Sequence, residues 1–300
     1  MPAESADAPE QYGPPCAQHG EGPVWDADAG VIRWVDMLAG DIMSAPPHSP
    51  DSAPLGNTAI TRRHVGVVAA ALRPRRAGGL VVAVERGFTL LGPDHDAPPQ
   101  PLPELWSDTG IRMNDGGCDP QGRFYCGSMA YDEAPGRGTL YRLDPAGDAE
   151  PVLDGATISN GLAWSPDGRT AYYVDTPTQR IDAFDFDAGT GTLHNRRPVA
   201  HIDEADGSPD GLTVDAEGHL WVALWCGAAV RRYSPDGALE AHLPLPVRHV
   251  TACAFGGPEL DTLYITTSQI DVTEPERAYA GALFVCRPGV RGLPVLPFAG

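Results

Sequence analysis

Four segments of this chain begin with the same short phrase, in which an acidic or amide residue is followed by glycine and an apolar run. They start at Glu21, Asp115, Asn160 and Asp210, and Thr251 opens a fifth, weaker copy. In each of the four, a turn and a second apolar run follow. The last three of these four starts lie 45 and 50 residues apart, which is the period of one β-propeller blade. Repeats closed in a ring bring equivalent positions together around one axis, so oxygen-bearing side chains in this register should converge.

The remaining sequence shows short apolar or alternating runs divided by Gly, Pro and Asp turns, with little helical periodicity. This pattern predicts an all-β fold, and at 300 residues a six-bladed β-propeller with a central metal site. The sixth blade fills the unmarked interval after the first, with an inner strand around Val65 to Ala71 that lacks an acid or amide. The run from Ala282 to Val290 is expected to give the last blade a strand. The clearest other strands are Val31–Val35, Leu80–Val84, Arg123–Cys126, Thr139–Leu143, Ala171–Val174, Leu220–Leu224 and Thr262–Thr266.

The chain is predicted to have a flexible tail over residues 1–16 and a single propeller domain over residues 17–300. Proline-rich surface connections are expected at 46–54 and 93–103. No stretch approaches the roughly 20 apolar residues that cross a bilayer. The polar, acidic start M-P-A-E-S lacks the basic and apolar regions of a signal peptide. A cytoplasmic location is therefore expected.

Composition excludes several functions. The net charge is −19, from 40 acidic and 21 basic residues. Phosphate backbones and anionic membrane surfaces repel such a surface, so neither nucleic acid nor membrane is an expected partner. All the basic residues are arginine. Without lysine, no side-chain Schiff base can form, and a P-loop nucleotide hydrolase is disfavoured.

The six cysteines show no metal-binding spacing and no C-x-x-C pair. Cys118, Cys126 and Cys253 lie within apolar runs, where cysteine behaves as a small buried hydrophobe. Buried, reduced thiols are predicted, with a disulfide or a reactive thiol as the alternative.

The repeated register predicts a metal site. Glu21, Asn160 and Asp210 offer hard oxygen donors, which suit calcium, magnesium or manganese. Asp115 shares the register, as a further ligand or as a hydrogen-bond acceptor beside the ligands. The alternative for any one of these residues is a simple turn, because an Asx side chain before glycine often bonds its own backbone.

Other polar residues surround this register. Arg112 and Asn114 precede Asp115 and could orient a polyhydroxylated or carbonyl-bearing substrate. His19 and His249 each stand two residues before a repeat start, and both are expected near the same end of the channel. There is no G-x-S-x-G elbow and no persuasive nucleophile triad. Activated water is therefore the expected nucleophile.

These segments resemble the family that contains gluconolactonase, regucalcin (senescence marker protein) and luciferin-regenerating enzyme. The matching pieces run in order from residue 20 to about residue 286. They include E-G-P-V-W-D, R-M-N-D-G-G-C-D-P-Q-G-R-F-Y-C-G-S-M, S-N-G-L-A-W-S-P-D-G-R-T-A-Y-Y-V-D-T and P-D-G-L-T-V-D-A-E-G-H-L-W-V-A-L-W.

The resemblance implies one divalent metal ion on Glu21, Asn160 and Asp210, with Asn114 near its open face. Calcium, zinc, magnesium, manganese and ferrous iron all stay open. It also implies that Arg112 and Asn114 bind substrate, together with an acid from A-Y-D-E. That acid is Asp132 or Glu133, and Asp132 is favoured.

Two features depart from the family pattern. His19 stands where the family commonly has a small or aliphatic residue. The loop between Gly40 and Arg62 is rich in proline and lacks the usual hairpin pattern. We expect this loop to reshape the rim over the substrate.

The favoured function is metal-dependent hydrolysis of a small-molecule aldonolactone, with Asp210 as the catalytic proton acceptor. One alternative is another reaction on the same scaffold, such as phosphotriester hydrolysis or a biosynthetic step. A second alternative is a calcium-binding regulatory protein without turnover. Either a monomer or a small homo-oligomer is expected.

Overall fold

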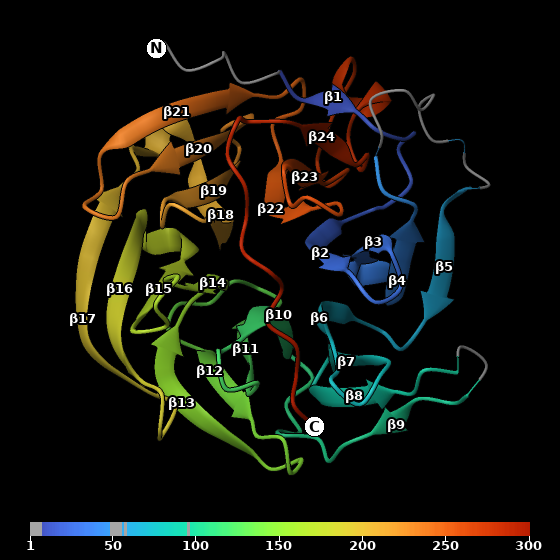
Figure 1. Ribbon diagram of the computed structural model, residues 1–300, viewed down its shortest axis with the longest axis vertical. Coiled ribbons are helices and arrows are strands. Elements are labelled where there is room, and N and C mark those ends of the chain that lie inside the picture. The colour runs from blue at the N-terminus through green and yellow to red at the C-terminus, as the bar shows by residue number, and fades with distance from the viewer. Residues whose placement is uncertain (1–7, 49–55, 57–58, 95–96) are drawn as a thin grey trace.

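The computed structural model describes residues 8–48, 56, 59–94 and 97–300. Within these ranges, 24 strands form six four-stranded antiparallel sheets arranged around a central axis (Figure 1). The prediction of an all-β, six-bladed propeller is confirmed. Each blade has its first strand at the axis and its last strand at the rim.

The first three blades carry two residues of the register, Glu21 in blade 1 and Asp115 in blade 3. Blade 1 contains β2 (Gly20–Asp26), β3 (Val31–Asp36), β4 (Asp41–Ala45) and β5 (Thr61–His64). Blade 2 contains β6 (Ala69–Pro74), β7 (Leu80–Val84), β8 (Gly87–Leu91) and β9 (Gln100–Pro101). Blade 3 contains β10 (Ile111–Cys118), β11 (Phe124–Ala130), β12 (Gly138–Leu143) and β13 (Ala149–Ala156).

The other three blades repeat this order. Blade 4 contains β14 (Ser159–Trp164), β15 (Thr170–Asp175), β16 (Arg180–Asp187) and β17 (Thr192–His201). Blade 5 contains β18 (Ser208–Val214), β19 (Leu220–Trp225), β20 (Ala229–Tyr233) and β21 (Leu239–Pro244). Blade 6 contains β22 (Val250–Gly256), β23 (Thr262–Thr267), β24 (Phe284–Cys286) and β1 (Glu10–Gln11). Short 3₁₀ helices are η1 (Met37–Ala39), η3 (Thr176–Thr178), η4 (Glu204–Asp206) and η5 (Glu276–Ala278).

The ring is closed by strands from opposite ends of the chain. In β1, Glu10 pairs with Val285 and Gln11 pairs with Phe284 of β24. Residues 10 and 11 therefore belong to blade 6, although the sequence places them in the tail. A strand at the rim pairs through its backbone alone, so it carries no apolar pattern to reveal it. Residues 1–7 of the predicted tail lie outside the described residues.

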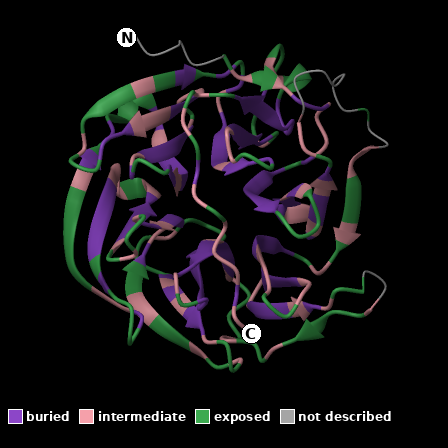
Figure 2. Cartoon of the chain, viewed as in Figure 1, coloured by how far each residue is buried: buried purple, intermediate pink, exposed green. Residues whose placement is uncertain are grey.

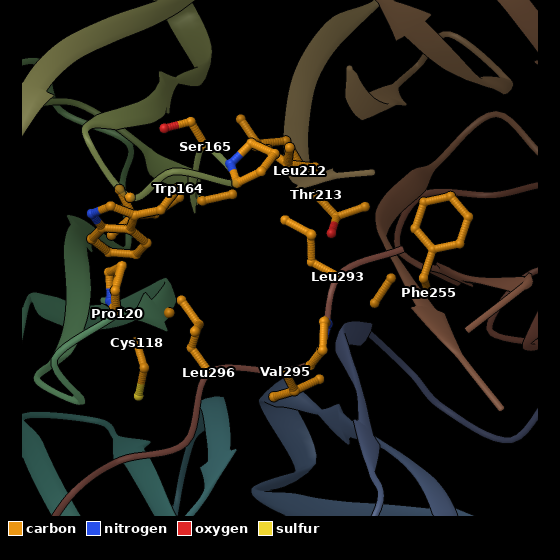
Figure 3. Close-up of a pocket in the computed structure, with 18 of the residues that line it drawn as sticks. Cys118, Pro120, Trp164, Ser165, Leu212, Thr213, Phe255, Leu293, Val295 and Leu296 are labelled. Atoms are coloured by element: carbon orange, nitrogen blue, oxygen red, sulfur yellow. The ribbon is translucent and has the colours of Figure 1, made fainter. Parts of the chain in front are cut away.

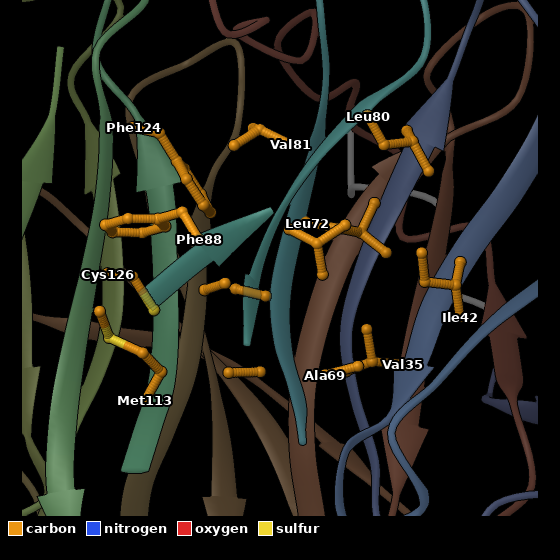
Figure 4. Close-up of a cluster of buried hydrophobic side chains, with 14 of the residues drawn as sticks. Val35, Ile42, Ala69, Leu72, Leu80, Val81, Phe88, Met113, Phe124 and Cys126 are labelled. Carbon is orange, nitrogen blue, oxygen red and sulfur yellow. The ribbon is translucent and has the colours of Figure 1, made fainter. Parts of the chain in front are cut away.

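The apolar core lies between neighbouring blades. The inner strands are buried, whereas the rim strands, such as β13 and β17, are largely exposed (Figure 2). Figure 4 shows one cluster in which Val35 of blade 1, Leu72 of blade 2 and Phe124 of blade 3 take part. The predicted burial of cysteine is confirmed for Cys118, Cys126 and Cys253, and the described residues contain no disulfide.

The two faces of the propeller differ. We call the face where the inner strands begin the site face, and the opposite face, where the first two strands of each blade are joined, the turn face. In blade 1, Asp26 pairs with Val31 at the turn face, and Ala45 pairs with Ile32 beside it. The connection after β4 therefore leaves from the turn face.

This placement corrects the prediction for the loop between Gly40 and Arg62. Asp41–Ala45 and Thr61–His64 form a hairpin, in which Ser44 pairs with Thr61. The segment between them starts and ends at the turn face, away from Glu21. The prediction that it reshapes the rim over the substrate is wrong, because the proline-rich stretch joins the outer two strands. Residues 49–55 and 57–58 lie outside the described residues.

The C-terminal segment, residues 287–300, crosses the central opening (Figure 1). At one end, Ala216 donates to the carbonyl of Arg291, and Gly292 donates to that of Leu260. At the other end, Phe298 donates to the carbonyl of Pro74, and Ala299 donates to that of Gly122. All these partners lie in turn-face connections. The segment therefore covers the turn-face end of the channel.

Candidate functional site

The residues of the repeated register lie at irregularities in the inner strands. Each of the six inner strands shifts its register against its second strand near the site face, for example between Glu21 and Val24 and between Asn160 and Leu162. An extra residue at such a bulge leaves the ladder and re-aims its side chain. This geometry turns side chains from different blades toward the axis.

Glycine after a register residue lets neighbouring inner strands approach closely. A Cβ atom at Gly161 would lie 2.7 Å from the carbonyl oxygen of Asp210. One at Gly211 would lie 2.9 Å from that of Thr251. The Asx-Gly pairs therefore lie inside strands rather than in the turns that were the alternative explanation.

The amide of Asn160 is held in one orientation. Its Nδ2 donates to Thr176 Oγ1 at 2.8 Å, and that hydroxyl donates to the carbonyl of Pro209 at 2.8 Å. The Oδ1 atom accepts from Asn114 Nδ2 at 3.1 Å. A hydroxyl that donates elsewhere can accept from the Asn160 NH₂ group, so the network assigns Oδ1 as the atom turned away from Thr176. Asn160 thus presents an oxygen donor.

Two carboxylates are buried beside this amide. Glu21 is 3% exposed and Asp210 is 5% exposed. Glu21 Oε2 accepts from the backbone of Gly22 at 3.1 Å, whereas Asp210 Oδ1 has no hydrogen-bond partner among the described residues. A buried carboxylate oxygen without a partner is costly. A cation would remove that cost.

The raised pKa values of Glu21 and Asp210 also indicate that a cation would stabilise this group. Burial, followed by the charge of Asp115, raises the pKa of Glu21 to about 8. Burial, followed by the charges of Glu21 and Asp115, raises the pKa of Asp210 well above its ordinary value. Asp115 is half-buried, and its Oδ1 accepts from Gly116 N at 2.7 Å. The two carboxylates and the Asn160 oxygen therefore fit a divalent cation with a preference for oxygen.

Arg112 and Asn114 form a contact pair next to these groups. Arg112 Nη1 donates to Asn114 Oδ1 at 2.7 Å and to the carbonyl of Met113 at 3.0 Å. Asn114 Nδ2 also donates to the carbonyl of Ser159 at 2.9 Å. The Arg112 guanidinium lies 5.8 Å from the centre of the Tyr131 ring. Burial lowers the pKa of Arg112, and the nearby Tyr131 and Glu21 partly offset this effect.

Asp132 does not join this pair. Its carboxylate is 70% exposed and lies 3.9 Å from Arg137 Nη1. Its Oδ1 accepts from the backbone of Ala134, which makes it part of a local turn. The charges of Tyr131 and Glu133 both raise the pKa of Arg112.

The two histidines meet at one aromatic side chain, as the sequence leads us to expect. The His249 ring stacks on Trp225 with centroids 4.0 Å apart and an interplanar angle of 4°. The His19 ring meets Trp225 edge-on at 6.0 Å. Burial, followed by the charge of Arg112, lowers the pKa of His19 to about 3. Trp225 was missed in the sequence because it ends a second strand, outside the repeated register.

A second group of possible metal ligands lies at the turn face. Asp215, Glu217 and His219 bring their ligand atoms together. Asp215 Oδ1, however, accepts from the backbone of Glu217 and of His219, and Oδ2 accepts from Trp221 Nε1 and Arg232 Nε. These bonds use the carboxylate to fix a turn, so this group is structural.

A pocket of about 370 Å³ also lies toward the turn face. Figure 3 shows Trp164, Phe255, Leu293 and Leu296 around it. Its wall includes inner-strand residues that follow the register positions, such as Cys118, and the C-terminal segment. The pocket and the Glu21–Asn160–Asp210 group therefore occupy different levels of the channel.

Comparison with known proteins agrees with the sequence resemblance. Residues 19–269 match the region described as SMP-30/Gluconolactonase/LRE-like. The chain belongs to this family. Within the described residues, no helix has the length and apolar character needed to span a membrane.

Family members with similar chains carry lactonase and regucalcin names. The Bacillus subtilis protein named "Putative sugar lactone lactonase YvrE" is 35% identical over 285 residues, covering 94% of this chain and 95% of that protein. Pentonolactonase XacC of Haloferax volcanii is 34% identical over 250 residues, covering 83% of this chain and 81% of that protein. The solved structure of regucalcin, a calcium-binding protein from Agrobacterium tumefaciens, matches with a TM-score of 0.86 and 27% identity, covering 95% of each chain.

Proposed function

We propose that the protein is a hydrolase that opens a sugar lactone with the help of one divalent metal ion. The observation that carries the proposal is the buried Asp210 carboxylate, whose Oδ1 has no hydrogen-bond partner among the described residues and whose pKa is raised by burial and by the charge of Glu21. Relatives named sugar lactone lactonase and pentonolactonase support the substrate class. The ion would be held by Glu21, Asn160 and Asp210, and calcium, zinc, magnesium, manganese and ferrous iron are the candidates.

When bound, the ion would polarise the lactone carbonyl and lower the pKa of a water molecule. Asp210 would accept the proton from the attacking water as the new carbon–oxygen bond forms. It would then return that proton to the ring oxygen as the ring carbon–oxygen bond breaks.

Arg112 and Asn114 would orient the substrate. The guanidinium is buried, donates to Asn114 and lies 5.8 Å from the centre of the Tyr131 ring, so its direction is fixed before substrate arrives. A planar group with several donors suits the carbonyl and hydroxyl oxygens of an aldonolactone. The exposed Tyr131 ring adds a surface for the sugar ring. For Asp132 to contact the substrate, the 131–134 turn would have to move when the substrate binds.

A calcium-binding role without turnover is the second candidate, because regucalcin is a structural neighbour described as calcium-binding. Metal buffering alone gives no reason for the Arg112–Asn114 pair. The hypothesis of phosphotriester hydrolysis rested on a substrate rim reshaped by the proline-rich loop. It loses this support, because the 46–60 connection starts at the turn face.

The test is metal-resolved hydrolysis. Protein stripped with a chelator is reloaded with each candidate ion and assayed for acid release from pentono- and hexonolactones, with phosphotriesters alongside. We expect lactone hydrolysis that depends on the added ion. Absence of acid release from every lactone with every ion contradicts the proposal, and faster phosphotriester turnover favours the other reaction.

A further inference from the structure

We propose that His19 and Ser268 form a relay that positions the carboxylate of Glu21 for the metal, with His19 as a hydrogen-bond donor and not as a ligand. This inference rests on the proposed metal centre. The His19 ring lies between Ser268, 2.9 Å from Nδ1, and Glu21, 3.8 Å from Nε2.

The group that faces Nε2 decides which ring nitrogen carries the proton. Nε2 faces Glu21 Oε1, and a carboxylate ionised to hold a metal can only accept a hydrogen bond, so the neutral ring meets it with the proton on Nε2. Nδ1 is then an acceptor for the Ser268 hydroxyl at 2.9 Å. Ser268 Oγ also accepts from the backbone N–H of Ile270 at 3.1 Å, which holds the hydroxyl in place.

The protonated Nε2 faces Glu21. The Glu21 Oε2 atom is already held by the backbone N–H of Gly22 at 3.1 Å, and Oε1 is the atom that lies 3.8 Å from His19. A carboxylate movement of less than about 1 Å would bring Oε1 into hydrogen-bond range. One donor would then fix each oxygen, which leaves the remaining lone pairs for the ion.

The ring cannot easily serve as a ligand instead. A histidine nitrogen binds metal through its lone pair, and the nitrogen that faces Glu21 carries the proton. Moving the proton to Nδ1 would leave the lone pair of Nε2 facing the carboxylate of Glu21. Groups that orient metal ligands in this way typically change metal affinity by about 10–100-fold when removed.

The backbone around His19 is also fixed. Its N–H donates to Asp36 Oδ1 at 3.0 Å, and its carbonyl accepts from Met37 N at 2.9 Å. The ring edge rests on Trp225 at 6.0 Å between centroids. With backbone and ring both held, the direction of Nε2 is set by the fold rather than by the ion.

The test compares His19→Leu, His19→Gln and Ser268→Ala with wild type. Calcium and manganese affinities of the chelator-stripped proteins are measured by calorimetry, using the ion that wild type binds more tightly. We expect His19→Leu to weaken binding about 10–100-fold. His19→Gln, which can place an amide N–H toward Glu21, should recover most of the affinity, and Ser268→Ala should give an intermediate loss.

His249→Leu is the matched control, because it removes the other imidazole packed on Trp225. It should leave the metal affinity unchanged if the effect of His19 runs through Glu21. Wild-type affinity in His19→Leu overturns the inference, as does an equal loss in His19→Leu and His249→Leu, or in His19→Leu and His19→Gln. A wild-type protein that binds no ion overturns the proposed function as well, so the two failures are distinguishable.

Discussion

Asp210 and Glu21 are alike in chemistry and differ in what surrounds them. Glu21 has a backbone N–H on Oε2 and His19 facing Oε1. Asp210 Oδ1 has no partner among the described residues. Glu21 has a polar group facing each of its oxygens and is suited to hold the ion, whereas the Asp210 oxygen without a partner can also accept a proton. We therefore propose that Glu21 mainly holds the metal, whereas Asp210 also transfers the proton.

Asp210→Asn should keep an oxygen donor and much of the metal affinity but lose the proton acceptor, lowering kcat by about 10²–10⁴-fold. Glu21→Gln should weaken metal binding instead, and excess metal should restore part of its activity. Calorimetry and kcat at saturating metal separate the two. Asp115→Asn is the control and should be the mildest. Equal rescue of Asp210→Asn and Glu21→Gln by metal contradicts the assignment.

Glu21 also predicts how the stability of the metal-free protein depends on pH. Its pKa is raised from 4.5 to about 8, chiefly by burial. The folded state therefore holds the proton more tightly than the unfolded state between these values, and the free energy of unfolding should fall as pH rises through this window. Urea unfolding of chelator-treated protein from about pH 5.5 to about pH 8.5 measures the slope. Glu21→Gln should flatten it, and an equal slope in both proteins contradicts the prediction.

Sequence repetition could predict which oxygen donors converge, because it depends only on register. It could not predict the orientation of Asn160, which Thr176 fixes from the 3₁₀ turn between β15 and β16 of blade 4. Nor could it find Tyr131 or Trp225, since both stand at the ends of second strands. It leaves the choice between Asp132 and Glu133 as the acidic substrate contact a prediction, because the sequence does not specify the geometry of the turn that carries both.

The inner strands serve as the elements that set the spacing of the site. Their bulges aim the side chains, and their glycines let adjacent strands come within backbone contact. The apolar second strands were predictable, and β3 (31–36), β7 (80–84) and β19 (220–225) match the predicted ranges closely. Rim strands such as β13 and β17 were not, because exposed strands need only backbone pairing and carry no apolar alternation.

Gly161→Ala should therefore harm both stability and metal binding. The added Cβ would lie 2.7 Å from the carbonyl oxygen of Asp210 and 2.9 Å from the nitrogen of Leu212. Both are backbone atoms, so only a strand shift can relieve the contact, at about 1–3 kcal/mol. Gly92→Ala is the control, since its Cβ would meet nothing within 4 Å. Urea unfolding and calorimetry measure the effects; unchanged metal affinity in Gly161→Ala would show that the strand spacing does not set the site.

At the scale of the whole molecule, a propeller must stop its ring from opening. β1 closes blade 6 at the rim through two residue pairs with β24. The C-terminal segment acts at the axis, where it joins turns of blades 5 and 6 to turns of blades 2 and 3. Neither device was visible in the sequence, because both depend on backbone pairing between residues far apart along the chain.

Phe298 anchors this C-terminal segment and gives the closure a measurable consequence. Its side chain is 1% exposed and packs in the cluster that includes Leu72 and Phe124. Phe298→Ala should lower the free energy of unfolding by about 3–5 kcal/mol, the usual cost of emptying such a site. Leu239→Ala, at a rim position 52% exposed, is the control and should stay within about 0.5 kcal/mol of wild type.

Because the anchor lies at the turn face, metal affinity should be unchanged in the folded Phe298→Ala protein. A stability equal to wild type in urea unfolding would mean that the segment folds separately from the blades, and a parallel loss of metal affinity would mean that the two ends of the channel are coupled.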